Sequence, residues 1–250
     1  MNVLDLFSGI GGFSLGLQWA GGFITKAFCE IDPFCRRVLN KNFPGVKIYE
    51  DIRSITSNVI RDECGRIDLI TAGFPCQPFS ECGKRKGEDD ERNMWPETIR
   101  LIRSIRPRWA LLENVAGLLS SGYFGRVLGD LAECGYDAEW RIIRASEFGL
   151  PHNRARLFIL AYPISGIGLR VQALEISPYK SIFRRCWQQG AEIVQSRTGR
   201  VRLVPEAGIS GVDDGLSVEL DAIRAIGNAV APQIVAAIGK AILGLDENIK

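Results

Sequence analysis

The chain has 250 residues, 46% of them hydrophobic and 24% charged, which suits one large domain or one domain with a small lobe. No apolar segment is long enough to span a membrane, and residues 1–5 lack the basic start of a signal peptide. Seven scattered cysteines and a single histidine argue against a disulfide framework and a Cys/His zinc site. We therefore expect a cytoplasmic protein with reduced thiols, no membrane association and no bound metal.

Strand and helix signals alternate along the first two thirds of the sequence. Strands are expected at residues 3–7, 24–30, 46–49, 68–72, 109–113, 139–144 and 157–162. Helices are expected up to about residue 20, from residue 33, and at residues 96–105, 124–133 and 226–243. This alternation predicts an α/β fold with a doubly wound, mostly parallel sheet.

The alternation stops after Pro163, and residues 164–222 show weak periodicity. We therefore expect residues 1–163 and 223–250 to form the large domain, and residues 164–222 to form a small irregular lobe. Six cations stand against one acid between residues 180 and 204, with two aromatic residues among them. Such a stretch fits a nucleic-acid surface, and it equally fits a solvated loop face.

The most informative segment follows the strand expected at residues 68–72. It reads Gly73-Phe74-Pro75-Cys76-Gln77-Pro78-Phe79-Ser80, which places Cys76 between two prolines in a stiff loop at a strand end. Loops at this edge of an α/β sheet commonly carry ligands and chemistry. A buried structural cysteine is the plain alternative. The strand context and the flanking prolines favour a nucleophile.

A glycine turn separates the first strand from the first helix. Its sequence, Phe7-Ser8-Gly9-Ile10-Gly11-Gly12, would let a nucleotide-like ligand approach the backbone closely, although an ordinary tight turn has the same appearance. The dinucleotide fingerprint requires a third glycine where Ser14 stands, which disfavours a nicotinamide or flavin. Glu30 and Asp51 follow the next two strands and could bind ribose hydroxyls and an adenine amine. Each could instead be a solvated carboxylate or a helix cap, but together they favour S-adenosylmethionine.

The fifth strand supplies a candidate partner for Cys76. It ends in Glu113, whose carboxyl group would have a raised pKa if it were buried, although the residue could simply cap the next turn. Arg154 and Arg156 precede the last strand, and their spacing places them on one face. Two guanidinium groups there could bind a carboxylate, a pyrimidine carbonyl or a phosphate, or could face solvent.

In this order, these motifs resemble those of the C5-cytosine DNA methyltransferases, and residues 227–232, Gly-Asn-Ala-Val-Ala-Pro, resemble the last motif of that family. The resemblance implies a Rossmann-like methyltransferase sheet, S-adenosylmethionine as cofactor, S-adenosylhomocysteine as product, and duplex DNA bound by a monomer. It implies methylation of C5 in a flipped-out cytosine through a covalent bond between Cys76 and C6. The implied catalytic residues are Cys76, Glu113, Arg154 and Arg156. The implied cofactor-binding residues are Phe7, Ser8, Gly9, Gly11, Gly12, Glu30, Ile31, Asp51, Ile52, Pro75, Trp95 and Asn228.

Two departures from the family pattern stand out. His152 occupies a position where the family commonly has glutamine, and residues 205–222 lack the segment that usually precedes the final motif.

Three other functions remain open: the same chemistry on transfer RNA, a binding protein that has lost catalysis, and a nicotinamide-dependent oxidoreductase. Intact Cys76, Glu113 and arginines disfavour the second function, and the missing glycine disfavours the third.

Overall fold

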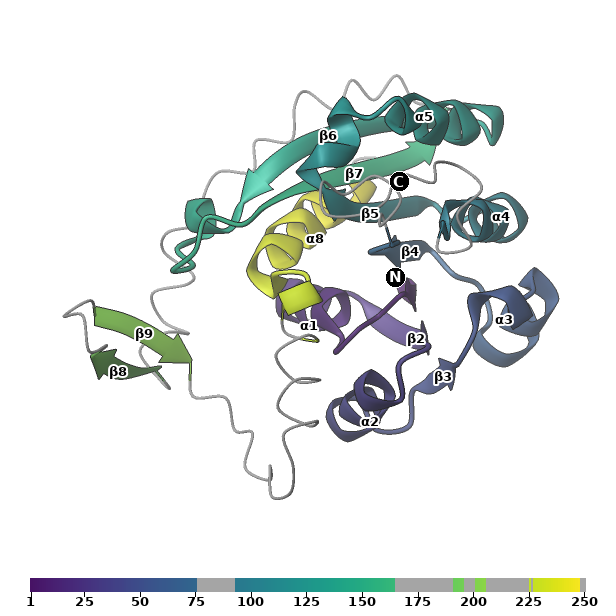
Figure 1. Ribbon diagram of the computed structural model, residues 1–250. Coiled ribbons are helices and arrows are strands. Elements are labelled where there is room, and N and C mark those ends of the chain that lie inside the picture. The colour runs from purple at the N-terminus through teal and green to yellow at the C-terminus, as the bar shows by residue number, and fades with distance from the viewer. Residues whose placement is uncertain (76–92, 165–190, 196–200, 206–224, 226, 248–250) are drawn as a thin grey trace.

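The computed structural model describes residues 1–75, 93–164, 191–195, 201–205, 225 and 227–247 (Figure 1). Seven strands form one sheet in the order β3-β2-β1-β4-β5-β7-β6. They are β1 (Asn2–Leu6), β2 (Ile24–Cys29), β3 (Lys47–Tyr49), β4 (Leu69–Ala72), β5 (Trp109–Val115), β6 (Tyr136–Arg144) and β7 (Ala155–Pro163). The pairs among β1 to β5 are parallel, whereas β7 is antiparallel to both β5 and β6.

Helices cover both faces of this sheet (Figure 1). They are α1 (Gly12–Ala20), α2 (Pro33–Asn42), α3 (Ser57–Cys64), α4 (Trp95–Ile105), α5 (Tyr123–Glu133) and α8 (Pro232–Glu247). Among the described residues, short 3₁₀ helices connect elements at η1 (Ile52–Ser54), η4 (Ala116–Ser120) and η5 (Ala145–Phe148). A second sheet pairs β8 (Ala191–Gln195) with β9 (Val201–Pro205) in antiparallel fashion.

The sheet is buried on both faces because successive side chains of a strand point to opposite sides. Leu4, Ile70 and Leu112 pack into one apolar cluster with residues of α3, α4 and α5. Their chain neighbours Val3, Leu69 and Leu111 pack into the opposite cluster with residues of α1 and α8. The result is a three-layer α/β domain, as the sequence predicts.

Helices α1 and α8 approach each other unusually closely. A Cβ atom on Gly16 would lie 2.5 Å from the Pro232 carbonyl oxygen and 2.6 Å from Val235 Cβ. A Cβ atom on Gly12 would lie 2.6 Å from the Val230 carbonyl oxygen. Glycine at these positions therefore allows the C-terminal segment to lie directly against the start of α1, beside the glycine turn.

The structure differs from the predicted elements in three places. Helix α3 was not expected, because it is short and mostly polar and buries only Ile60. The helix predicted at residues 226–243 is interrupted: residues 227 and 228 are helical, residues 229–231 are not, and α8 then begins at Pro232, in keeping with the preference of proline for a first helical turn. The β8–β9 hairpin lies within residues 164–222, where its five-residue strands gave no clear periodic signal.

Candidate active site

The predicted motifs converge at the carboxyl ends of the parallel strands. Strand β1 lies between β2 and β4: the chain runs from β1 through β2 to β3 on one side and then crosses back to β4 and β5 on the other side. Such a switch point opens a crevice in which ligands of α/β proteins commonly bind. The glycine turn follows β1, Glu30 follows β2, the segment leading to Cys76 follows β4, and Glu113 lies near the end of β5.

The backbone of the glycine turn adopts positive φ values at three of its residues. Gly9 and Gly11 have φ values of 54° and 90°, and Phe7 has a φ of 53°, a value uncommon for a residue with a side chain. A Cβ atom on Gly11 would lie 2.5 Å from the ring of Phe43, whereas one on Gly9 would meet no atom of the described residues within 4 Å. Gly11 thus packs tightly against the protein, and Gly9 borders open space.

Glu30 is held beside this turn by two backbone amides. Its Oε2 accepts a hydrogen bond from the N–H of Gly9 at 2.7 Å, and its Oε1 accepts one from the N–H of Asp32 at 2.8 Å. Each carboxylate oxygen retains capacity for a further donor. The next residue, Ile31, is 69% exposed, so a large apolar side chain faces solvent next to a fixed carboxylate. This pairing suits a ligand that combines a ribose with an aromatic base.

Asp51 serves as a cap in this structure. Its Oδ1 accepts a hydrogen bond from the N–H of Arg53 at 2.9 Å, at the start of η1, and Ile52 is buried. Contact of either residue with a cofactor therefore stays a prediction.

Asn114 fixes the start of the segment that carries Cys76. Its Nδ2 donates a hydrogen bond to the carbonyl oxygen of Phe74 at 3.0 Å, and its Oδ1 accepts one from the N–H of Val115 at 2.8 Å. Pro75 is exposed, and Cys76 itself lies outside the described residues. Asn114 belongs to the Glu113-Asn114-Val115 motif, but the sequence suggested a role for Glu113 alone. In the structure, the Asn114 amide links the end of β5 to the chain two residues before the cysteine.

Residues of α5 bind the chain at Asn93 and Trp95, which follow the cysteine segment in the sequence. Asn93 donates a hydrogen bond from Nδ2 to the hydroxyl of Tyr123 at 2.7 Å, and the indole N–H of Trp95 donates to Asp130 at 2.8 Å. The Trp95 ring lies 5.1 Å from that of Phe74 and is 1% exposed. Trp95 thus packs within the core, and its predicted contact with the cofactor stays a prediction. The sequence did not predict these contacts of Tyr123 and Asp130. Its one indication was an acid inside an amphipathic helix.

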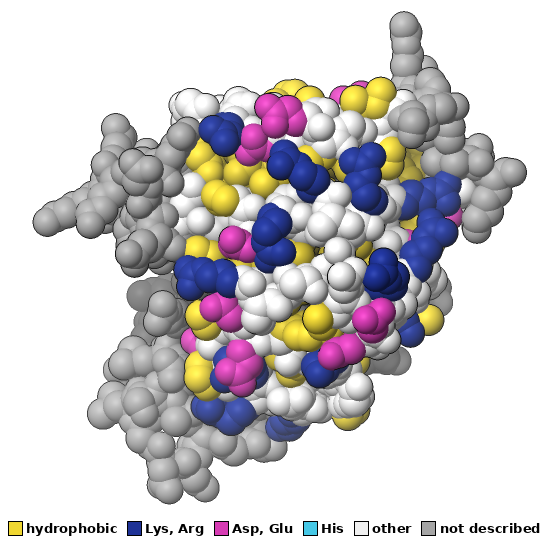
Figure 2. Space-filling view, turned by 90° about the vertical axis from the view of Figure 1, so that its right-hand side faces the viewer, with side chains coloured by type: hydrophobic (Ala, Val, Ile, Leu, Met, Phe, Trp, Pro, Cys, Tyr) yellow, Lys and Arg dark blue, Asp and Glu magenta, His cyan; other side chains and the backbone are white. Residues whose placement is uncertain are grey.

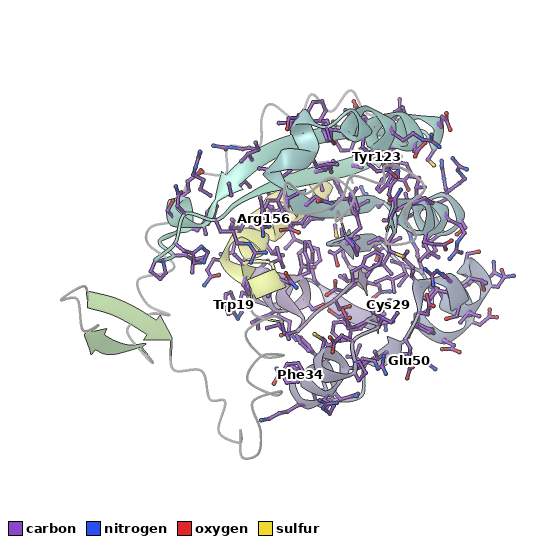
Figure 3. All side chains as sticks on the ribbon, in the orientation of Figure 1. Trp19, Cys29, Phe34, Glu50, Tyr123 and Arg156 are labelled. Atoms are coloured by element: carbon purple, nitrogen blue, oxygen red, sulfur yellow. The ribbon has the colours of Figure 1, made fainter. Side chains whose placement is uncertain are left out.

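Glu113 and Arg156 form an ion pair at the end of β5. Glu113 Oε1 lies 3.0 Å from Arg156 Nε, and the carboxyl group is buried. The distance is that of a hydrogen bond, but the Arg156 N–H does not point at the oxygen. Glu113 Oε1 therefore has no well-directed donor among the described residues. Burial raises the pKa of Glu113 above its ordinary value, while the charges of Arg156 and Arg154 act in the opposite direction. Arg156, labelled in Figure 3, lies on β7.

Arg154 contacts a different part of the chain. Its guanidinium donates hydrogen bonds to the carbonyl oxygens of Gly227 at 2.6 Å and of Asn228 at 3.3 Å. Its backbone N–H points to Nδ1 of His152 at 3.4 Å. The two arginines thus lie at the start of β7, Arg154 directly before the strand and Arg156 within it, but they have separate partners: Arg156 pairs with Glu113, and Arg154 binds backbone carbonyls.

A buried polar cluster lies beneath the glycine turn. Asp5, on β1, is fully buried and accepts hydrogen bonds from the hydroxyls of Ser14 at 2.8 Å and Thr71 at 2.9 Å. The Ser14 hydroxyl in turn accepts one from Thr25 at 2.9 Å. Burial raises the pKa of Asp5 to about 7, and the two hydroxyl donors oppose this rise. In the sequence, this buried cluster could have been suspected from Asp5 alone, because it is an acid within an otherwise apolar strand.

Several cations on the described surface around α3 and α4 pair with acids. Figure 2 shows cations interspersed with acids on this side of the molecule. Arg66 lies 3.2 Å from Asp68, Arg100 lies 2.7 Å from Glu97, and Arg103 lies 3.7 Å from Glu133. Such exposed pairs are typical of a solvated face. The cations between residues 180 and 204 lie outside the residues with described side chains.

In the described part of the chain, no group of three or more His, Cys, Asp or Glu side chains is arranged to hold a metal ion. Within the same residues, no helix combines the length and apolar character needed to cross a membrane.

Comparison with known proteins agrees with this geometry. A family model described as C-5 cytosine-specific DNA methylase matches residues 1–169. Type II methyltransferase M2.BsuMI of Bacillus subtilis is 42% identical over an alignment of 172 residues that covers 64% of this chain and 42% of that protein. Type II methyltransferase M.NgoMIV of Neisseria gonorrhoeae is 36% identical, over 63% of this chain and 50% of that protein. The chain therefore matches half or less of the length of these two relatives.

Solved structures show the same similarity. A putative DNA modification methyltransferase from an Escherichia coli prophage has 32% identity and a TM-score of 0.57, covering 65% of this chain and 47% of that one. The Dnmt2 methyltransferase of Schizosaccharomyces pombe has a TM-score of 0.60 and covers 100% of this chain and 99% of that one. Its identity is 20%, so this second match supports the fold alone.

Proposed function

The chain belongs to the C-5 cytosine-specific DNA methylase family, and from this premise we propose that it transfers a methyl group from S-adenosylmethionine to C5 of cytosine in duplex DNA. One observation carries the proposal beyond family membership. The buried Glu113, paired with Arg156, lies beside the strand end that leads to Cys76. A Cβ atom on Gly73, three residues before the cysteine, would lie 3.5 Å from the other carboxylate oxygen of Glu113.

The residues around the glycine turn fit the proposed cofactor. Open space beside Gly9 would admit a ligand close to the backbone, and the fixed carboxylate of Glu30 would accept hydrogen bonds from ribose hydroxyls. The exposed Ile31 offers an apolar contact for a base. When bound there, S-adenosylmethionine would supply the methyl group. We propose that Phe7, Ser8, Gly11, Gly12 and Asn228 complete this pocket.

Cys76 would act as the nucleophile. Cytosine C5 is a weak nucleophile, and addition of the Cys76 thiolate to C6 converts the ring into an enamine that reacts at C5. After methylation, loss of the C5 proton and breakage of the C6–S bond release 5-methylcytosine and restore the thiolate. Asn114 would position this nucleophile by holding the carbonyl of Phe74.

Glu113 would stabilise the charge that develops on the ring. Its raised pKa suits a carboxyl group that donates to N3 of cytosine or shares a proton with it near neutral pH. Arg156, at 3.0 Å from Glu113, would orient this carboxyl group and reach the carbonyl of the base. The geometry thus favours Arg156 for the base contact that the sequence suggested for Arg154.

The target cytosine would have to leave the duplex. C6 is inaccessible in stacked DNA, so the nucleotide must flip into the site before Cys76 can reach it. We propose that residues 164–222, which include the β8–β9 hairpin, form the target-recognition lobe.

A methyl-transfer assay tests the proposal. Protein incubated with radiolabelled S-adenosylmethionine should label duplex DNA, and bisulfite sequencing should locate the product at C5 of cytosine. Transfer RNA serves as the competing substrate, because one branch of the family that the chain resembles methylates transfer RNA. Label in transfer RNA but not in DNA would show that the substrate is RNA and would contradict the proposed DNA substrate. Label in neither would contradict the proposed activity.

A further inference from the structure

Arg154, which lies directly before β7, connects the start of that strand to the segment that precedes α8. Its Nη1 donates to the carbonyl oxygen of Gly227 at 2.6 Å, and its Nη2 donates to that of Asn228 at 3.3 Å. Both acceptors are backbone atoms about seventy residues further along the chain. A planar guanidinium can bind two such carbonyls at once, whereas a lysine ammonium offers only a point charge.

The segment held by Arg154 lies next to the proposed cofactor pocket. Val230, two residues after Asn228, packs so closely on the glycine turn that a Cβ atom on Gly12 would lie 2.6 Å from its carbonyl oxygen. Residues 227–230 therefore extend from the Arg154 guanidinium to the start of α1. A shift of these residues would displace Asn228 relative to the glycine turn.

The partners of the two arginines separate their roles. Arg156 pairs with Glu113, and Arg154 directs two of its donors to carbonyl oxygens of residues 227 and 228. We propose that Arg154 is a positioning residue that holds Asn228 in the cofactor pocket and does not itself bind the target base. This inference rests on the proposed function, since it assigns the cofactor contact to Asn228.

Calorimetry with S-adenosylmethionine on the full chain tests the inference. In Arg154→Gln the Kd for the cofactor should rise by about tenfold or more, since hydrogen bonds from a charged donor are lost. The kcat at saturating cofactor and the affinity for DNA should be largely retained. Arg154→Lys should show a smaller rise in Kd, because one carbonyl keeps a charged donor. The matched control is Arg141→Gln on β6, an exposed residue outside the site, which should bind the cofactor as wild type does.

A double variant distinguishes positioning from a general structural effect. If Arg154 acts through Asn228, the losses of cofactor affinity in Arg154→Gln and Asn228→Ala should not add in the double variant. Fully additive losses, or an unchanged Kd in Arg154→Gln, would overturn the inference. A fall in kcat with unchanged cofactor Kd would overturn it as well and return Arg154 to the base site. Wild-type protein that binds no S-adenosylmethionine would instead contradict the proposed function.

Discussion

Glu113 Oε1 and Arg156 Nε lie 3.0 Å apart on the neighbouring antiparallel strands β5 and β7. Burial favours the neutral form of this carboxyl group, and the guanidinium favours the charged form. The pair therefore holds a carboxyl group whose protonation can respond to a bound base. Its location beside the strand end that leads to Cys76 makes it the centre of the proposed mechanism.

The first prediction concerns this carboxyl group. Glu113→Gln keeps the shape of the side chain but cannot share a proton with the base. Single-turnover methyl transfer should slow by about 100- to 1,000-fold, the typical effect of removing one such stabilising group. Binding of DNA and cofactor should persist. A variant with the wild-type rate would remove Glu113 from the chemistry.

The second prediction concerns the link between β5 and the cysteine segment. Asn114→Ala removes the donor to the Phe74 carbonyl, so the segment should lose its fixed start. Formation of the covalent complex with DNA should slow by about tenfold to 100-fold, as expected when a reacting group is misplaced. Asn58→Ala on α3, which removes an exposed contact to Arg61, is the control and should react as wild type does. Equal rates in both variants would refute the positioning role of Asn114.

The third prediction concerns stability and pH. The pKa of Asp5 is about 7 in the folded chain, against an ordinary value of 3.8, so the folded state binds more protons than the unfolded state between these values. The free energy of unfolding should therefore fall as pH rises through this window. Between pH 5 and pH 7, urea denaturation of wild type should show a loss about 2 kcal/mol larger than that of Asp5→Asn. Parallel curves for the two proteins would contradict the raised pKa.

The fourth prediction tests the packing that places the C-terminal segment. Gly16→Ala adds a methyl group where Pro232 and Val235 leave no space, so it should lower the free energy of unfolding by about 1–3 kcal/mol. Gly125→Ala on α5 is the matched control, because its new methyl group would meet no atom within 4 Å. That variant should gain about 0.5–1 kcal/mol from helix propensity. Urea denaturation of both variants measures the difference, and a stabilised Gly16→Ala would contradict the close approach of α1 and α8.

The sequence predicted the sheet and the position of its main motifs because these depend on local patterns. Apolar β-branched runs marked the strands, and the parallel order then brought Glu30 and Glu113 to one sheet edge. The partners of these residues could not be predicted in the same way. The hydrogen bonds of Arg154 to Gly227 and Asn228, and of Asn93 to Tyr123, join distant segments whose approach depends on helix packing. Short α3 was missed because a mostly polar helix has little periodic signal.

The most direct test of the account uses DNA that carries 5-fluorocytosine at the target position. Fluorine at C5 cannot leave as a cation, so the bond between Cys76 and C6 should persist after methyl transfer. Wild-type protein with S-adenosylmethionine should give a complex that survives denaturation, and mass spectrometry should locate the modified base on Cys76. Cys76→Ser should give no such complex. A wild-type protein that methylates cytosine without forming this complex, or that forms it at another residue, would contradict the account.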